Sequence, residues 1–456
     1  MIARLGHWLS DKAKRWVPDP FVLAILLTAI VFVLALPMLA WSPRAVIETW
    51  IEGAGGGKGF WRLLAFAMQM CLILLTGYAL AESRACKSAV QRLARWPQST
   101  ASAAVMVASV AMGCALLNWG LGLIIGALLA REVGRVARLE RRPLHYPLIC
   151  AAGYTGLAVW HGGLSGSAPL KVTNTKQLTE ILGPELAQQL EPMLLGETIG
   201  STLNLIVLGA CFLVIPTVLA LMSPKRPDQM IAAQADDPEE NVDEFDAPTT
   251  PAERLNQSFI IVAIPAIMGL SWFALWLATH GLGKLNPNVI NLVMLSIGLL
   301  LHGSVKSYVH AIQRAVRSCA GIILQYPFYA GIMGIMAGAG LVGMLGAHLS
   351  GLGPAPLAMS TFYSAGLVNL FVPSGGGQWA VQGPIVMEAA LQAGAHPQTI
   401  LMALCYGDQW TNLIQPFWAL PLLGICRISV SAIIGYTAIL LLVSQLCFVV
   451  PLLFFV

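Results

Sequence analysis

The sequence predicts an all-α polytopic membrane protein, and two observations carry that prediction. Of its 456 residues, 57% are hydrophobic and only 11% are charged, whereas about 25% of the residues in a soluble domain are charged. The apolar residues form continuous runs, and a spanning helix needs roughly 20 of them. Strands of a membrane β-barrel would instead alternate over about ten residues. The runs cover residues 21–39, 63–80, 101–130, 146–170, 199–222, 259–279, 289–301, 320–345, 357–386, 400–425 and 428–456.

Basic residues predict the orientation, because cytoplasmic segments of membrane proteins concentrate Lys and Arg. The N-terminal segment and the segments after residues 80 and 130 are all basic. We therefore place all three inside, with a cytoplasmic N-terminus. The first run is too long for the apolar core of a signal peptide and is expected to be the first span. Six of the 26 Lys and Arg residues then lie outside: Arg44, Lys58, Arg62, Lys171, Lys176 and Lys284.

The run at 101–130 has two basic flanks, and a single span would put them on opposite sides of the membrane. A re-entrant hairpin that enters from the cytoplasm resolves this contradiction. Asn118, Trp119 and Gly120 stand near the middle of the run, so we expect the turn there. Irregular backbone at that depth is tolerated only where it is buried in protein or lines a cavity.

The second half carries the complementary pattern. Its run at 357–386 is interrupted by the segment 373–378, and the flanks near 346–356 and 391–398 contain no Lys or Arg. Flanks without basic residues are typical of segments outside the cytoplasm. We therefore predict a second hairpin, at about 357–391, that enters from the outside.

Short matches relate the two halves. Leu116-Leu117-Asn118 corresponds to Leu367-Val368-Asn369, and Tyr154 corresponds to Tyr406. Because the two hairpins face opposite ways, the repeats are inverted, a design in which discontinuous helices form a midplane site. The expected organisation has about nine spanning helices, with a hairpin and a broken helix in each repeat. It comprises a first inverted repeat at 1–222 with its hairpin at about 101–130, an acidic cytoplasmic linker and linking helix at 223–285, and a second inverted repeat at 286–456 with its hairpin at about 357–391.

Polar residues inside apolar runs are costly and mark functional sites. They gather at four places, which are the two hairpin tips and two segments, near 160–167 and 407–416, that contain helix-breaking residues. The candidate substrate-binding residues are Asn118, Trp119, Gly120, His161, Ser165, Ser167, Asn369, Ser374, Gly375, Gly376, Gly377, Gln378, Asn412 and Gln415.

This residue set suits a small carboxylate. A half-helix that starts at a hairpin tip presents free N–H groups and partial positive charge to an anion. Glycines allow the backbone to approach the ligand closely. No Lys or Arg lies deep in these segments, so neutral donors are expected to hold a monoanion. The residues expected to line its apolar tail are Trp119, Trp160, Trp379 and Trp410.

Asp408 is the one acidic residue central to a broken segment, and we expect it to couple transport as a proton carrier or Na⁺ ligand. The alternative is an N-cap of a half-helix that starts near Gln409. A Na⁺ site near Asn118, Asn369 and Asp408 is consistent with the same residues, and no cofactor beyond Na⁺ or H⁺ is expected. His161 is a proton relay, a donor to substrate, or a structural histidine.

Other function classes fit less well. Gly163-Leu164-Ser165-Gly166-Ser167 nearly matches the G-x-S-x-G elbow, and His161 with Asp408 would complete the triad of an intramembrane hydrolase. That elbow needs a strand–turn–helix context, which the pattern lacks. The sequence contains no P-loop, dinucleotide motif or metal-spaced cluster, and nothing points to nucleic acid. A passive channel is a third class, but paired hairpins favour alternating access.

The same residues resemble the AtoE short-chain fatty acid transporter family. The resemblance runs nearly end to end. Its most specific parts are Pro373-Ser374-Gly375-Gly376-Gly377 and Gln415-Pro416-Phe417-Trp418-Ala419-Leu420-Pro421. Further shared segments are Trp16-Val17-Pro18-Asp19-Pro20, Asn118-Trp119-Gly120 and Tyr406-Gly407-Asp408-Gln409-Trp410.

This resemblance implies a symporter for short-chain fatty acids, such as butyrate or acetoacetate, in a bacterial inner membrane. Transport of another small carboxylate or of a dicarboxylate is the alternative. The family is grouped with the ion-transporter superfamily, whose dicarboxylate members use paired hairpins and an elevator-type motion. By the same analogy, the protein is expected to form a homodimer surrounded by the lipid bilayer.

Overall fold

The computed structural model describes residues 20–53, 59–224, 226, 230–233, 247–371 and 374–456. All regular structure in these ranges is helical, and none of the described residues forms a strand. This confirms the all-α prediction. The basic N-terminal residues, Lys58, Pro373 and the acidic residues 236–246 lie outside the described residues.

The described residues of the first half, taken to end before the linker, form eleven α-helices. They are α2 (Pro20–Ala35), α3 (Pro43–Glu52), α4 (Leu64–Glu82), α5 (Arg84–Leu93), α6 (Thr100–Leu117), α7 (Trp119–Leu139), α8 (Tyr146–Tyr154), α9 (Ser167–Lys171), α10 (Thr175–Leu182), α11 (Pro184–Gln188) and α12 (Thr202–Leu221). Polar caps begin several of them, as at Ser99 before α6 and Ser201 before α12, where each hydroxyl accepts a backbone N–H.

The second half follows a short helix, α13 (Pro251–Asn256), and the predicted linking helix, α14 (Phe259–His280). Its helices are α15 (Pro287–His302), α16 (Val305–Ala315), α17 (Ala320–Gly338), α18 (Leu341–Ser350), α19 (Pro354–Phe371), α20 (Gly375–Ala393), α21 (Pro397–Thr411), α22 (Pro416–Cys426) and α23 (Val430–Phe454). Within the described ranges, 6 helices are long and apolar enough to cross a membrane, while α2 and α15 are shorter apolar helices. The expected total of about nine spans stays a prediction.

Both predicted hairpins are pairs of packed helices. In the first, α6 and α7 pack together and only Asn118 separates them. The extended backbone of Asn118 (φ −155°) ends α6, and its Oδ1 accepts the N–H of Leu121 to start α7. The second arm continues to Leu139, past the expected end at 130. In the second pair, α19 and α20, Ser374 caps α20 by accepting the N–H of Gly377.

Both segments predicted to be broken helices are interrupted where the polar residues gather. Between α8 and α9 the chain forms two short 3₁₀ turns, Thr155–Ala158 and Trp160–Gly162. Between α21 and α22 it forms another, Asn412–Ile414. Below, these two stretches are called the first break (155–166) and the second break (412–415).

Each break is held by a side chain from the other half of the protein. The Tyr154 hydroxyl lies 2.8 Å from both the Asn412 and Gln415 carbonyl oxygens of the second break. In return, Gln409 Oε1 accepts the N–H of His161 in the first break at 3.0 Å. Buried backbone groups need such partners, so the two breaks support one another.

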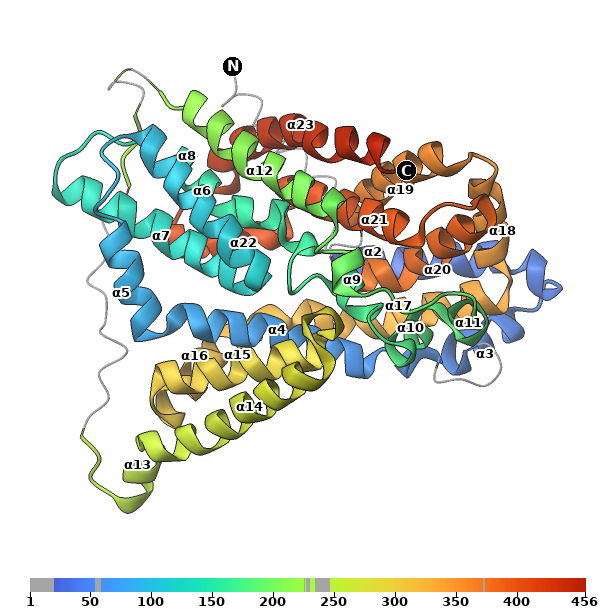
Figure 1. Cartoon of the computed structure of the whole chain (residues 1–456), viewed down its shortest axis with the longest axis horizontal. Helices are drawn as coiled ribbons and strands as arrows, with labels where there is room; N and C mark the ends of the chain where they lie inside the picture. Colours follow the sequence, from blue (N-terminus) through green and yellow to red (C-terminus); the bar gives the residue numbers. More distant parts are fainter. Residues whose placement is uncertain (1–19, 54–58, 225, 227–229, 234–246, 372–373) are drawn as a thin grey trace.

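The helices α4 and α17 lie at the centre of the molecule. The α14–α16 group packs on one side of α4, and Figure 1 shows α6, α7, α8, α12 and α23 on the other. α17 contacts α4, α20 and the N-terminal helices α2 and α3. This arrangement places the two helix pairs and the two breaks against the α4–α17 pair.

Candidate functional site

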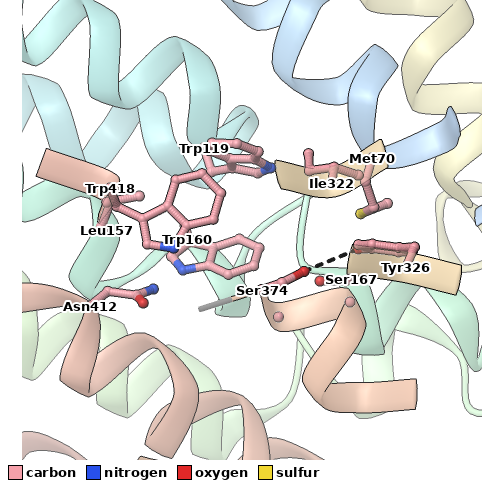
Figure 2. Close-up of a pocket in the computed structure, with 12 residues that line it drawn as sticks. Met70, Trp119, Leu157, Trp160, Ser167, Ile322, Tyr326, Ser374, Asn412 and Trp418 are labelled. Carbon is pink, nitrogen blue, oxygen red and sulfur yellow. Dashed lines mark hydrogen bonds between the residues drawn. The ribbon is translucent and has the colours of Figure 1, made fainter. Parts of the chain in front are cut away.

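A small cavity of about 30 Å³ lies where the two hairpin tips and the two breaks meet α4 and α17 (Figure 2). Tryptophan rings of three different segments lie along one side of it, and Tyr326 of α17 lies on the opposite side. Its lining residues are Met70, Trp119, Leu157, Trp160, Ser167, Ile322, Tyr326, Ser374, Gly375, Gly376, Asn412 and Trp418.

Two hydrogen-bonding groups in this lining have no partner in the protein. The Trp160 indole Nε1 and the Ser167 hydroxyl are buried, and no described residue bonds to either. Leaving a buried donor unpaired costs about 1–3 kcal/mol, so folded proteins rarely retain one without a reason. Both residues belong to the first break and its following helix, and both are available to a ligand in the cavity.

The start of α20 forms another part of the wall. Gly375 and Gly376 have the first N–H groups of this helix, which have no partner inside it and lie at its positive end. A Cβ on Gly375 would lie 2.6 Å from the Trp160 ring, and one on Gly376 would lie 2.3 Å from the Tyr326 hydroxyl oxygen. Only glycine therefore allows the start of α20 to lie this close to the cavity.

Ser374 links that helix start to α17. Its hydroxyl donates to the Tyr326 hydroxyl at 3.3 Å, the contact drawn as a dashed line in Figure 2. The same oxygen accepts the N–H of Gly377 at 3.2 Å. Ser374 thus has two roles: it caps α20 and connects the second hairpin tip to the central helix pair.

A buried hydrogen bond between a histidine and a carboxyl group lies directly behind the cavity. His161 Nδ1 is 2.5 Å from Asp408 Oδ2, and both side chains are essentially inaccessible to solvent. His161 Nε2 accepts the N–H of Ala168 at 3.3 Å, which places the proton of a neutral ring on Nδ1, pointing at Asp408. The Trp160 ring stacks on His161 at 4.4 Å. One aromatic ring therefore separates the pair from the cavity.

Asp408 lies inside α21, three residues before its end at Thr411. The alternative interpretation of Asp408 as an N-cap is therefore wrong, because the half-helix does not begin there. Its second oxygen, Oδ1, is buried and has no partner among the described residues. This leaves the carboxylate with free capacity to accept a proton or a cation.

Asn369 organises the second break. Its Nδ2 lies within 2.9 Å of the Asp408 carbonyl, the Thr411 hydroxyl and, at 2.8 Å, the Asn412 side-chain oxygen. Gln415 donates to the Asn369 carbonyl. Asn369 Oδ1 is buried without a partner in the described structure. Asn412, the only one of these residues in the cavity lining, is thus positioned by its neighbours.

The oxygen atoms around Asp408 fit a hard cation only in part. Two unpaired oxygens, Asp408 Oδ1 and Asn369 Oδ1, are of the type that hard cations prefer. Asn118 makes no hydrogen bond to either residue in the described structure; its Nδ2 donates to the Ile73 carbonyl instead. The described residues contain no group of three or more His, Cys, Asp or Glu side chains that could hold a metal.

The structure divides the predicted site residues into two groups. Those that line the cavity are Trp119, Ser167, Ser374, Gly375, Gly376 and Asn412. Those that support it from behind are Asn118, Gly120, His161, Ser165, Asn369, Gly377, Gln378 and Gln415. Ser165, for example, accepts the N–H of Trp119 at 2.9 Å and so joins the first hairpin tip to the first break.

Two predicted aromatic residues lie elsewhere. Trp379 is fully buried in α20 and packs against Gly383. Trp410 donates to the Leu441 carbonyl, and its ring stacks on Phe362 at 5.1 Å. Trp410 thus fills contacts of α21 with α19 and α23, and neither ring lines the cavity. The residues that sequence reasoning did not assign to the cavity are Met70, Leu157, Ile322, Tyr326 and Trp418.

Lys171 is buried in the protein, whereas the sequence led us to expect no cation deep in these segments. It ends α9 and is 1% exposed. Its Nζ lies 2.8 Å from Glu180 Oε2 and 4.2 Å above the centre of the Phe66 ring. The ion pair and the aromatic face replace the water that a buried ammonium loses.

The hydrolase alternative does not match these contacts. The Ser165 hydroxyl pairs with Trp119, and the two ring nitrogens of His161 pair with Asp408 and Ala168. Among the described residues, no serine hydroxyl forms a hydrogen bond with His161. The strand that an elbow requires is also absent from them.

Comparison with solved structures identifies transporters that share this fold. The chain is similar to the YdaH transporter of Alcanivorax borkumensis, described as having an unusual topology, with TM-score 0.56 and 16% identity over 96% of this chain and 97% of that one. It is also similar to MtrF of Neisseria gonorrhoeae, with TM-score 0.56 and 17% identity over 100% and 97% of the chains.

Comparison of sequences is more specific. A full-length relative from Escherichia coli (strain K12), which bears the name of a short-chain fatty acid transporter, is 38% identical over 100% of both chains. One from Haemophilus influenzae, with the same name, is 33% identical over 100% of both. The family model for short chain fatty acid transporters matches residues 1–455. Together with the helical membrane fold, these matches show that the chain belongs to the short-chain fatty acid transporter family and is a multi-pass membrane transporter, not an enzyme.

Proposed function

We propose that this protein is a secondary active transporter that moves short-chain fatty acids, such as butyrate or acetoacetate, across the bacterial inner membrane. One observation carries the proposal. The unpaired Trp160 and Ser167 donors share a small, otherwise apolar cavity with the start of α20. Uncharged donors at a helix N-terminus suit a carboxylate, and apolar walls suit a short alkyl tail.

The binding mode follows from these walls. The carboxylate accepts hydrogen bonds from Ser167, Trp160 and the first N–H groups of α20. The alkyl chain lies against Leu157, Ile322 and Met70. At about 30 Å³ the cavity has room for only a few water molecules, so an acid of any chain length must displace buried side chains to enter it.

Coupling is assigned to the His161–Asp408 pair. With His161 neutral and Asp408 ionised, the pair carries one buried negative charge, which is costly in a membrane protein. One proton, or a Na⁺ ion at the unpaired Asp408 and Asn369 oxygens, neutralises it. The coupling ion thus allows the substrate carboxylate to bind without adding a second negative charge to the site. Trp160, stacked on His161, transmits the state of the pair to the cavity.

Alternating access requires a route from each side. A cavity of about 920 Å³ is lined by Arg62 and Gln69 near the start of α4 and by Ala337 near the end of α17. A second, of about 530 Å³, is lined by Tyr78 near the end of α4 and Gln325 near the start of α17. The two cavities therefore lie toward opposite ends of an antiparallel helix pair, with the central cavity between them.

This arrangement supports the proposal of two inverted repeats. Each half runs through the same order of elements: a spanning helix, an amphipathic helix, a central helix, a short helix, a hairpin, a broken helix and a last long helix. In that order α4 corresponds to α17, and α12 corresponds to α23. We also propose a homodimer, which sedimentation of the detergent-solubilised protein would test.

The decisive experiment is uptake of labelled butyrate into proteoliposomes under separately imposed proton and Na⁺ gradients. Wild type is compared with Asp408→Asn, which keeps the shape of the side chain and removes its charge. We expect saturable, gradient-driven accumulation in wild type and its loss in the variant, while exchange of butyrate across the membrane persists.

The outcomes separate the parts of the proposal. Accumulation that survives Asp408→Asn would exclude Asp408 from coupling. Absence of saturable uptake in wild type under either gradient would exclude butyrate as substrate, and the same assay with other small carboxylates and dicarboxylates would follow. The gradient that drives uptake identifies the coupling ion.

A further inference from the structure

The cavity at the start of α4 has a cationic rim and a closed floor. We call it the Arg62 vestibule; its polar lining residues are Arg62, Gln69, Asn174, Lys176, Gln177, Thr179, Glu180, Asn286 and Asn288. Arg62 donates to the Thr179 carbonyl at 2.8 Å, which fixes the guanidinium at its wall. A wide cavity with basic residues raises the local concentration of anions.

The floor of the vestibule is a series of three side chains. Glu180 lines the vestibule and is 24% exposed. It pairs with the Lys171 ammonium, which is 1% exposed and lies over the Phe66 ring. Phe66 in turn packs on Gly376 of the central cavity, where a Cβ would lie 2.9 Å from the ring. One buried cation thus separates the vestibule from the central cavity.

We propose that the Lys171 ammonium is a second carboxylate-binding site, where a substrate carboxylate from the vestibule replaces Glu180 before it enters the central cavity. The inference rests on the proposed function. Carboxylate exchange keeps the ammonium paired throughout, and this avoids the cost of an isolated buried charge. The displaced Glu180 side chain remains at the vestibule, where water can solvate it.

The exchange also explains why a cation lies here and not in the central cavity. At Lys171 the positive charge of the ammonium compensates the carboxylate for the water it loses. In the central cavity, uncharged donors bind the carboxylate weakly enough to release it. The Phe66 ring shields the ammonium on one face and separates it from Gly376. Substrate that arrives through the vestibule therefore binds transiently at Lys171 before it enters the central cavity. Substrate that arrives from the opposite side enters the central cavity without meeting Lys171.

The test is the KM for butyrate measured separately from each side, in proteoliposomes that contain the protein in one orientation. Lys171→Met is expected to raise the KM on the vestibule side about tenfold, because it removes a charge-assisted contact. Glu180→Gln is expected to lower the KM on that side, because it removes the competing carboxylate. Neither variant is expected to change the KM on the opposite side.

Lys284→Met is the matched control, because Lys284 is an exposed lysine that does not line the vestibule. It is expected to leave both KM values unchanged. Equal KM increases on both sides in Lys171→Met, or none on either, would overturn the inference. If Lys171→Met does not fold, an unchanged vestibule-side KM in Glu180→Gln overturns it. Wild type that transports no butyrate from either side would instead refute the proposed function, and with it this site.

Discussion

Ser167 has a buried hydroxyl with no partner among the described residues. Its substitution therefore tests substrate binding without changing the stability of the fold. Ser167→Ala removes no hydrogen bond from the protein. We expect the KM for butyrate to rise about tenfold, the effect of losing one hydrogen bond to a charged group. The melting temperature of the solubilised protein should not fall. Both quantities are measurable on the same preparation.

Thr361→Val is the control for this prediction. The Thr361 hydroxyl is likewise buried and unpaired, but it lies in α19 and outside the cavity lining. Its removal should leave the KM unchanged. A similar KM increase in both variants would show that the Ser167 effect is indirect.

Asn118 is expected to show the opposite behaviour. Its side chain caps α7 and donates to the Ile73 carbonyl of α4. Asn118→Ala should therefore cost about 0.5–2 kcal/mol or more of stability, as loss of a helix cap does, and lower the melting temperature. The KM of the protein that remains folded should match wild type. If the KM rises and stability is unchanged, Asn118 contacts the substrate and its role as a helix cap is secondary.

The site residues that the sequence revealed are those that break an apolar pattern. Ser167, Ser374 and Asn412 are polar at membrane depth, where burial is costly without a purpose. Met70 and Ile322 carry no such signal, because apolar residues in a helix look the same whether they face a cavity or a neighbour. Distinguishing cap from ligand, as at Asn118, required the hydrogen bonds themselves.

At the scale of elements, small residues decide how closely the helices pack. Gly126 in α7 and Gly153 in α8 face one another, and a Cβ on Gly126 would lie 2.2 Å from the Gly153 carbonyl oxygen. Gly126→Ala should therefore separate the two helices and destabilise the protein by about 1–3 kcal/mol, the range for overpacked cores. Thermal unfolding in detergent measures the loss.

Gly113→Ala is the matched control, since Gly113 lies in α6 and a Cβ there would meet nothing within 4 Å. Alanine has the higher helix propensity, so this variant should be neutral or slightly stabilised. Equal destabilisation by the two substitutions would contradict the close packing of α7 on α8.

The hairpins and breaks were predictable as elements because their tips concentrate glycine, proline and capping residues. Asn118 and Ser374 each stand at a helix start in the sequence as in the structure. The folded segment α9–α11 was not predicted, since its helices of five to eight residues are too short to show a period. The burial of Lys171 depends on Phe66 and Glu180, which are distant from one another in sequence.

At the scale of the whole molecule, the predicted inversion makes the two hairpins open toward opposite sides. A protease-cleavable tag inserted after Glu140 should be cleaved only in inside-out vesicles, because the basic residues predict that the flanks of the first hairpin are cytoplasmic. A tag after Gly394 should be cleaved only in right-side-out vesicles. Cleavage of both tags from the same side would contradict inverted repeats.

The mutual support of the two breaks also constrains when the protein can mature. Tyr154 is synthesised long before Asn412 and Gln415, whose carbonyl groups accept its hydroxyl. His161 is likewise synthesised long before Gln409, which accepts its N–H. In a nascent chain that ends within α20, the first break is already withdrawn from water. Its backbone N–H groups, such as that of His161, still lack their hydrogen-bond partner Gln409. The N-terminal half is thus an incomplete folding unit that the insertion machinery must protect until the last helices arrive. Truncations that remove residues 409–415 should for this reason be degraded and not merely inactive.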